Sequence, residues 1–301
     1  IKLISDSLQL SENAVKNTIT LLNEGATIPF ISRYRKEMTG GLDEVQIGQI
    51  KDQLDKLSEL VKRKETILST IAEQKKLTDE LKQRIENCWN ATELEDIYLP
   101  YKPKRRTRAE IAREKGLEPL AKMIMAQNSA DIIRMAQPFV KDKVENVEDA
   151  LKGASDIIAE WINESETARN AVRRIFSYEA VITSKLIKGK EEEAQKYRDY
   201  FDMSEKLSRC SSHRLLAMRR GEAEGLLRVS ISPDDEHCIE RLERIFVKSK
   251  NASGELVKEA TLDAYKRLLK PSIETEFAAE SKTKADTEAI RVFAENLKQL
   301  L

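Results

Sequence analysis

Residues 43–73 read DEVQIGQIKDQLDKLSELVKRKETILSTIAE. Positions 47, 50, 54, 57, 61, 64, 68 and 71 alternate by three and four, and they hold Ile, Ile, Leu, Leu, Val, Lys, Leu and Ile. In a helix, this spacing places the side chains at these positions along one face, and nearly all of them are apolar. The pattern predicts a single long helix with a coiled-coil-like apolar seam. Asp43 with Gln46 forms a start that resembles a capping box.

The segments on either side of this helix also have helical patterns. Thr78 can cap a second helix that carries Leu81 and Ile85, and the short link between the two predicts an antiparallel helical hairpin. On the N-terminal side, Ser11 can cap one helix and Thr27 a short second one. The pair predicts a helix-turn-helix-like arrangement.

Helical patterns continue through the second half of the chain. Ser165 is expected to cap a long helix that Gly189 ends, and further helices are expected around 255–269 and from Ser272 to the end. Residues 225–231 are the segment whose sequence predicts a β-strand. We therefore expect an all-α, multi-helical fold with a helix-turn-helix-like N-terminal part, a long helical hairpin and at most one or two short strands.

Shorter signals mark several helix starts. Thr92 with Glu95, and Thr107 with Glu110, match the S/T-x-x-E capping box. Ser232-Pro233-Asp234-Asp235 reads as another start, with Ser232 as the cap.

Composition limits the classes of function that fit this chain. Lys plus Arg total 52 and Asp plus Glu total 52, so the formal net charge is zero. A dedicated nucleic-acid-binding domain usually has an excess of basic residues, so any contact with nucleic acid must come from a local patch. With three cysteines, no secretory signal and no long apolar run, we expect a cytoplasmic protein that does not enter a membrane. The helical pattern runs to residue 301 without a stop signal, so we expect further chain to follow.

The richest candidate site is a run of cations beside Tyr98 and Tyr101. Cations can bind phosphates and tyrosines can stack on bases, which predicts contact with nucleic acid or polymerase. The alternative is a solvated loop whose cations pair with acids such as Glu93, Glu95 and Asp96. The cations of this basic loop are Lys102, Lys104, Arg105, Arg106 and Arg108.

A second candidate follows the expected helix-turn-helix. Arg33, Arg35 and Lys36 stand where a recognition helix would meet a duplex. The alternative is that these cations are structural, and Tyr34 fits as a core residue.

Signals for catalysis and for metal binding are weak. Cys210-x-x-His213 and His237-Cys238 provide two Cys and two His, but adjacent ligands suit a tetrahedral zinc site poorly. The sequence has no G-x-S-x-G, H-E-x-x-H or G-x-x-x-x-G-K-[ST] motif. We expect no catalytic residues, no metal and no cofactor, and we expect that the chain is not an enzyme.

Several longer segments resemble one family. The matching segments occur in the family's order and are residues 25–37, 39–44, 98–120, 221–229 and 290–297. They resemble the Tex-type transcription accessory proteins of bacteria. The resemblance implies a multidomain nucleic-acid-binding protein that is linked to transcription and related to a eukaryotic elongation factor that travels with RNA polymerase. It also implies that this helical region precedes an RNase H-like domain, helix-hairpin-helix elements and an OB-fold RNA-binding domain, none of which is recognisable in these residues.

From the resemblance we expect a Tex-like N-terminal helical domain at 1–189 and a central helical region at 190–301. The expected function is a non-catalytic helical scaffold that contributes to binding of RNA, DNA or RNA polymerase. The alternative is a purely structural or protein-interaction module, with nucleic acid bound by C-terminal domains that are missing here. A second alternative is that the chain belongs to a hydrolase, and the lack of catalytic motifs counts against this alternative.

Overall fold

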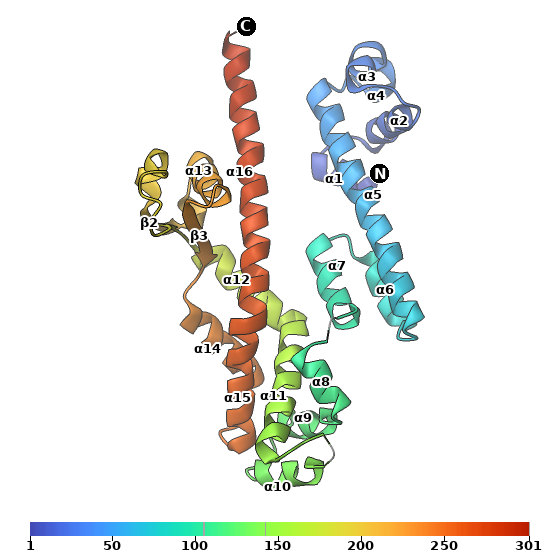
Figure 1. Cartoon of the computed structure of the whole chain (residues 1–301). Coiled ribbons are helices and arrows are strands. Elements are labelled where there is room, and N and C mark those ends of the chain that lie inside the picture. The colour runs from blue at the N-terminus through green and yellow to red at the C-terminus, as the bar shows by residue number, and fades with distance from the viewer. Residues whose placement is uncertain (105, 142, 301) are drawn as a thin grey trace. The chain divides into compact units, whose positions relative to one another are not determined.

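The computed structural model describes residues 1–104, 106–141 and 143–300, with side chains as far as 297. It consists mainly of helices (Figure 1), which confirms the expected mostly helical class. The chain forms two compact units, Ile1–Pro103 and Lys104–Leu301. The boundary expected near Gly189 falls inside the second unit, and as a boundary between domains it stays a prediction.

Unit 1 is built around the long helix that the seam predicts. Asp43 Oδ1 accepts a hydrogen bond from the Gln46 amide at 2.8 Å, and Gln46 Oε1 accepts one from the Asp43 amide at 3.1 Å. The predicted capping box and the single helix are confirmed. The elements of this unit are α1 (Lys2–Leu8), α2 (Glu12–Asn23), α3 (Ile28–Tyr34), α4 (Lys36–Thr39), α5 (Glu44–Glu73), α6 (Asp79–Asn87), α7 (Ala91–Tyr98) and η1 (Leu99–Tyr101).

Two separate hydrophobic clusters form along α5. Ile47 and Ile50 pack with α1–α3, whereas Ile67 and Ile71 pack with α6 and α7. The end of α6 returns to the middle of α5, where Lys64 Nζ donates to the Glu86 carbonyl oxygen at 2.7 Å. The predicted antiparallel hairpin is therefore present.

Unit 2 has one large core that includes Leu117, Ile158, Phe176 and Tyr265. Its N-terminal elements are α8 (Arg108–Glu114), α9 (Glu118–Met125), α10 (Ile132–Ala136), η2 (Gln137–Phe139), α11 (Val147–Glu164) and α12 (Glu166–Glu179). The remaining elements are β1 (Val181–Leu186), η3 (Gln195–Tyr200), β2 (Asp202–Lys206), η4 (Leu207–Arg209), α13 (Ser212–Ala223), β3 (Leu227–Ser232), α14 (Asp235–Phe246), α15 (Ala252–Ala264), η5 (Tyr265–Leu269) and α16 (Lys270–Leu300).

Unit 2 contains a three-stranded antiparallel sheet in the order β2-β1-β3, and β1 replaces the last part of the helix expected before Gly189. Strand β3 confirms the strand signal at 225–231, but the expectation of at most two strands is wrong. The helix that Ser165 caps ends at Glu179, and β1 begins at Val181. The β-branched residues of β1 favour a strand once β2 and β3 are available to pair with it.

Several helix boundaries also differ from the expected ones. Asn90 rather than Thr92 caps α7, and Asp234 rather than Ser232 caps α14, whereas Thr107 caps α8 as predicted. The break expected near residue 270 is absent, because α15 continues through η5 into α16.

The segment η5 is a π-helical turn that ends two residues before Pro271. Proline has no amide hydrogen, and its ring clashes with the carbonyl group four residues earlier in a regular α-helix. The wider turn accommodates Pro271, so the helix continues where the sequence predicts a break.

Candidate nucleic-acid interface

The short helices α3 and α4 present an aromatic pair on the surface of unit 1. Gly25, at φ +87°, follows α2, and Pro29 lies in the first turn of α3. Phe30 and Tyr34 are 39% and 64% exposed, and their ring centroids lie 5.5 Å apart. The alternative in which Tyr34 is a core residue is wrong, because the buried residues of α3 are Ile31 and Ser32.

Three predicted cations follow Phe30 in the sequence, and one of them contacts its ring. The Arg35 guanidinium lies 5.2 Å from the centroid of the Phe30 ring, and Lys36 is exposed. Arg33 Nε lies 3.8 Å from Glu44 Oε1, with both side chains more than half exposed. Such an exposed ion pair is weak and leaves the cation available to a ligand.

We call Phe30, Arg33, Tyr34, Arg35 and Lys36 the aromatic-basic patch. Sequence reasoning found its cations but missed Phe30. The i, i+4 spacing of Phe30 and Tyr34 was the available signal, because it places both rings on one helical face. The arrangement provides stacking surfaces and positive charge over two short helices.

The cations of the basic loop differ in their ion pairs and in their exposure. The Lys104 ammonium forms ion pairs with Glu160 and Glu164 of α11. Arg106 is 72% exposed, and its Nη2 lies 3.4 Å from Glu114 Oε2. Arg105 lies outside the described residues.

Lys102 and Arg108 are exposed and make no ion pair with another described residue. Of the acids expected as partners of the loop, Glu95 instead binds Arg63, with nitrogen–oxygen distances of 2.6 and 3.0 Å. The cations of the loop that remain most accessible are therefore Lys102, Arg106 and Arg108.

The two tyrosines beside the loop have structural contacts. Tyr98 is buried in the second cluster of unit 1, and the Arg63 guanidinium lies 5.2 Å from the centroid of its ring. The Tyr101 carbonyl oxygen accepts a hydrogen bond from Gln74 at 2.7 Å. Tyr98 is therefore not available for stacking on a base.

The acids that hold Lys104 form a buried ionic cluster. Glu160 and Glu164 have side chains that are 8% and 12% exposed, and Arg113 Nη1 lies 3.2 Å from Glu160 Oε2. Burial opposes ionisation of Glu160, but Lys104 and Arg113 together hold the pKa of that carboxyl below its usual range. Burial raises the pKa of Glu164, and Lys104 offsets only part of this effect.

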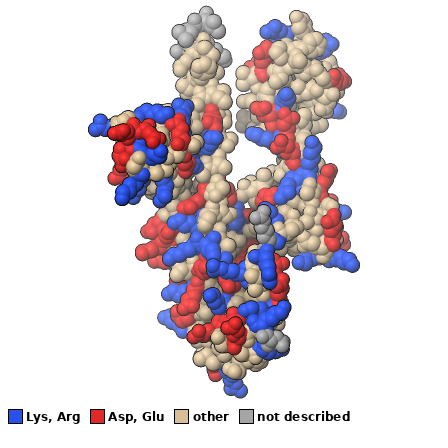
Figure 2. Space-filling model, viewed as in Figure 1, with Lys and Arg blue, Asp and Glu red and all other residues tan. Residues whose placement is uncertain are grey.

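Charges of both signs are interspersed over each unit in the view of Figure 2. This distribution agrees with the zero net charge of the chain. Contact with a polyanion must therefore depend on local groups such as the aromatic-basic patch.

The cysteines and histidines are not arranged as a metal site. Burial, followed by the neighbouring Glu205, raises the pKa of the Cys210 thiol to about 12, and burial raises that of Cys238 to about 11. His237 Nδ1 lies 2.9 Å from Glu179 Oε2. Within the described ranges, no group of three or more His, Cys, Asp or Glu side chains could hold a metal ion. None of the described helices is long and apolar enough to span a membrane.

Two family models match this chain. The Tex central region-like model matches residues 127–293, and the Tex-like protein N-terminal domain model matches residues 1–72. The first match alone covers more than half of the chain. The chain belongs to the Tex family. The expected resemblance to Tex is thereby confirmed.

Similar proteins occur in bacteria and in animals. The Bacillus subtilis protein YdcI is 41% identical over 303 residues, a match that covers 99% of this chain and 42% of YdcI. The transcriptional accessory protein Tex of Neisseria gonorrhoeae is 40% identical over 306 residues, covering 100% of this chain and 40% of that protein. The human S1 RNA-binding domain-containing protein 1 is 28% identical over 318 residues, covering 100% of this chain and 32% of that protein. The chain thus spans about two fifths of the length of these bacterial Tex relatives.

Proposed function

We propose that this chain is a non-catalytic helical scaffold of a transcription accessory protein and that it contributes a weak contact to nucleic acid. The observation that carries this proposal is the aromatic-basic patch, where two exposed rings lie 5.5 Å apart and the Arg35 guanidinium lies over one of them. Aromatic faces and nearby cations are what single-stranded nucleic acid needs for binding without strong sequence preference. RNA and DNA both offer these features.

The basic loop provides a second, smaller contribution. Lys102, Arg106 and Arg108 can each meet a phosphate, whereas the charge of Lys104 is already compensated by two carboxylates. The names of two relatives support a role near transcription and RNA, since one is a transcriptional accessory protein and another contains an S1 RNA-binding domain. A role in polymerase-associated binding is part of the same proposal.

The experiment is a titration of the 301-residue chain into labelled single-stranded RNA and DNA, followed by fluorescence anisotropy. Tyr34→Ala is expected to weaken binding by about 5-fold or more, since stacking of one base contributes roughly 1–3 kcal/mol. Tyr178→Ala is the matched control, because Tyr178 is 72% exposed on α12, outside both candidate surfaces. It should leave binding unchanged.

The alternative function predicts a different pattern. If the chain is purely structural or binds only proteins, wild type and Tyr34→Ala will bind neither nucleic acid above the level of a charge-neutral control protein. Equal losses for Tyr34→Ala and Tyr178→Ala would also count against the patch.

A further inference from the structure

The middle of α5 carries an apolar groove that the fold of unit 1 leaves open. The cavity has a volume of about 760 Å³ and lies between α1, α2, α5 and the segment after α6. Leu3, Val61 and Trp89 are 43%, 40% and 45% exposed. We call this the α5 groove, and its apolar lining includes Leu3, Ile19, Leu54, Leu57, Val61 and Trp89.

The groove exists because α5 is longer than either hydrophobic cluster that packs on it. Ile47 and Ile50 are fully buried in the first cluster, and Ile67 and Ile71 are fully buried in the second. Between these pairs, the seam continues through positions 54, 57 and 61 without full cover. An exposed heptad-spaced stripe of this kind is the surface that a further helix packs against.

Trp89 gives the groove a defined wall. The Lys64 ammonium lies 3.6 Å from the centroid of the Trp89 ring and donates to the Glu86 carbonyl oxygen. This contact fixes the indole beside Val61, where both side chains line the same cavity. A fixed, half-exposed tryptophan in a concave apolar surface is typical of the anchor points of protein interfaces.

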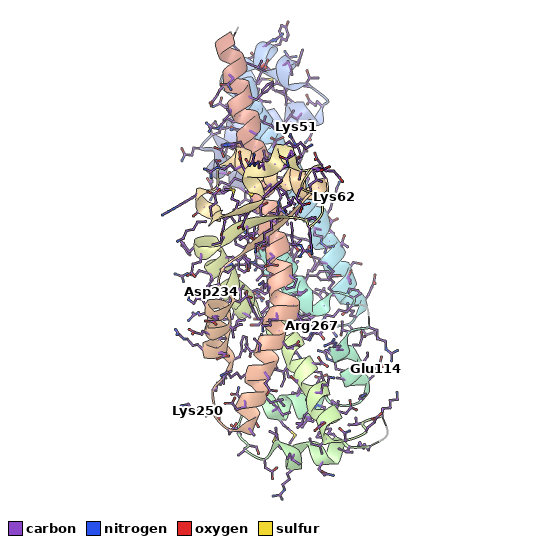
Figure 3. All side chains as sticks on the ribbon, turned by 60° about the vertical axis from the view of Figure 1, so that its left-hand side comes forward. Lys51, Lys62, Glu114, Asp234, Lys250 and Arg267 are labelled. Carbon is purple, nitrogen blue, oxygen red and sulfur yellow. The ribbon has the colours of Figure 1, made fainter. Side chains whose placement is uncertain are left out.

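Cations border the groove. Lys2 and Lys62 line it together with the single acidic residue Glu65. Lys51 does not line the groove, but it is eleven positions from Lys62, about three helical turns, so both lie on one side of α5 with Asp55 between them (both lysines are labelled in Figure 3). Lys2, Lys51 and Lys62 form no ion pair with any other residue that the structure describes. The side chains that line the groove therefore include two cations and one carboxylate, an excess of one positive charge.

We propose that the α5 groove binds an amphipathic helix of a protein partner, with apolar residues at i, i+3 or i+4 and i+7 and with acidic flanks. The distance along α5 from Leu54 to Val61 is about 10 Å, or two turns, which matches anchors with that spacing. Acidic flanks would meet Lys2, Lys51 and Lys62. This interaction is separate from the proposed contact with nucleic acid, which uses the aromatic-basic patch and the basic loop.

The test uses two helical peptides of about 18 residues with identical leucine positions. One carries Glu on both flanks and the other carries Lys. Each peptide is labelled, and its binding to the 301-residue chain is measured by fluorescence anisotropy. The acidic peptide should bind at least about 10-fold more tightly than the basic one, since like charges at an interface disfavour the wrong partner.

Variants locate the binding to the groove. Val61→Asp is expected to weaken binding of the acidic peptide by at least about 10-fold, because it places a carboxylate on the apolar floor. Val45→Asp is the matched control, since Val45 is an exposed valine of the same helix that does not line the groove. Lys62→Glu should weaken binding of the acidic peptide by about 3-fold and improve binding of the basic peptide, as expected for an exposed charge pair.

Two further measurements distinguish a loss of binding from misfolding of the variants. In Trp161→Phe protein, Trp89 is the remaining tryptophan, and its emission should shift to shorter wavelength when the acidic peptide binds. Helix content measured by circular dichroism should be the same for the two Asp variants as for wild type. Equal binding of the two peptides, no binding of either, or equal losses for Val61→Asp and Val45→Asp would each overturn the proposal. Displacement of the peptide by single-stranded RNA would overturn it too, because the groove would then be part of the nucleic-acid surface.

Discussion

Gly254 lies so close to Ser249 that a β-carbon at residue 254 would be 1.9 Å from the Ser249 carbonyl oxygen. Asn251 caps α15 and accepts a hydrogen bond from the Gly254 amide at 2.9 Å. The Ser249 amide in turn donates to Gln127 Oε1 at 3.2 Å. The loop before α15 is therefore held on both sides, and its backbone cannot move away from a larger residue.

We expect Gly254→Ala to lower the midpoint of thermal unfolding strongly, with a loss of at least about 2 kcal/mol from overpacking against the backbone. Gly48→Ala is the control, because a β-carbon at Gly48 has no atom within 4 Å. That change should stabilise α5 by roughly 0.5–1 kcal/mol through helix propensity. Circular dichroism at 222 nm checks both, and a Gly254→Ala protein as stable as wild type would contradict the close approach.

The buried cluster around Lys104 predicts a stability change that depends on pH. Lys104→Met removes the cation from two buried carboxylates, and it should destabilise the fold by about 3 kcal/mol at pH 7.5. Glu160 and Glu164 would then repel each other, so their pKa values in the folded variant would lie above those in the unfolded chain. A carboxyl with a raised folded pKa gains stability as pH falls, so the deficit should shrink between pH 7.5 and pH 5.

Lys122→Met is the control for this prediction, because Lys122 is 67% exposed and, among the described residues, forms its ion pair with Glu118 of the same helix. Its urea unfolding curve should match that of wild type at both pH values. A deficit for Lys104→Met that stays constant from pH 7.5 to pH 5 would show that lost packing, not charge, causes the effect.

The accessible cations of the basic loop predict a change in salt dependence. Arg106→Ala with Arg108→Ala should lower the slope of log affinity against log salt by about 2 on duplex DNA, at roughly 0.9 per phosphate. Lys122→Ala with Arg244→Ala removes two other exposed cations and serves as the control. Anisotropy titrations at several salt concentrations measure the slope, and equal slopes for the two double variants would rule out a specific role of the loop.

The raised pKa values of two thiols predict slow alkylation. At pH 8, a thiol with a pKa of about 12, as for Cys210, has on the order of 10³ times less thiolate than a free cysteine. Cys238 combines a pKa of about 11 with complete burial. Iodoacetamide labelling followed by peptide mass spectrometry should therefore modify both far more slowly in native protein than in urea. Rapid labelling of Cys238 in the native state would contradict its burial.

Local patterns predicted the helices well where one segment contains all the information. Asp43, Gln46 and the seam of α5 form such a segment, and the observed helix begins at the expected residue. The sheet could not be predicted in this way, because β1 pairs with strands that follow it by some 20 to 50 residues. Strand β2, Asp202–Lys206, is a polar edge strand with one apolar residue, and its sequence carries no strand signal.

Only part of the candidate site could be predicted, because the sequence does not show which distant residues contact each other. Charges are visible in a sequence, but their partners are not: Lys104 meets Glu160, which lies 56 positions away. Exposure of Tyr34 depends on which face of α3 packs inward, and one helix of seven residues gives too little pattern to decide that.

The π-helical turn of η5 also constrains how this family's sequences can change in length. A π turn contains one residue more than an α turn, so it acts as a tolerated single-residue insertion. Deleting Lys266 would let the segment return to regular α-helix with α16 in nearly the same rotation relative to α15, because the wider turn absorbs the extra residue. Ile273 and Ala285 would stay buried, but the ring of Pro271 would then clash with the carbonyl group four residues earlier. A one-residue deletion within 265–269 should therefore keep α16 in register at the cost of that clash, whereas one later in α16 would turn all that follows by about 100°.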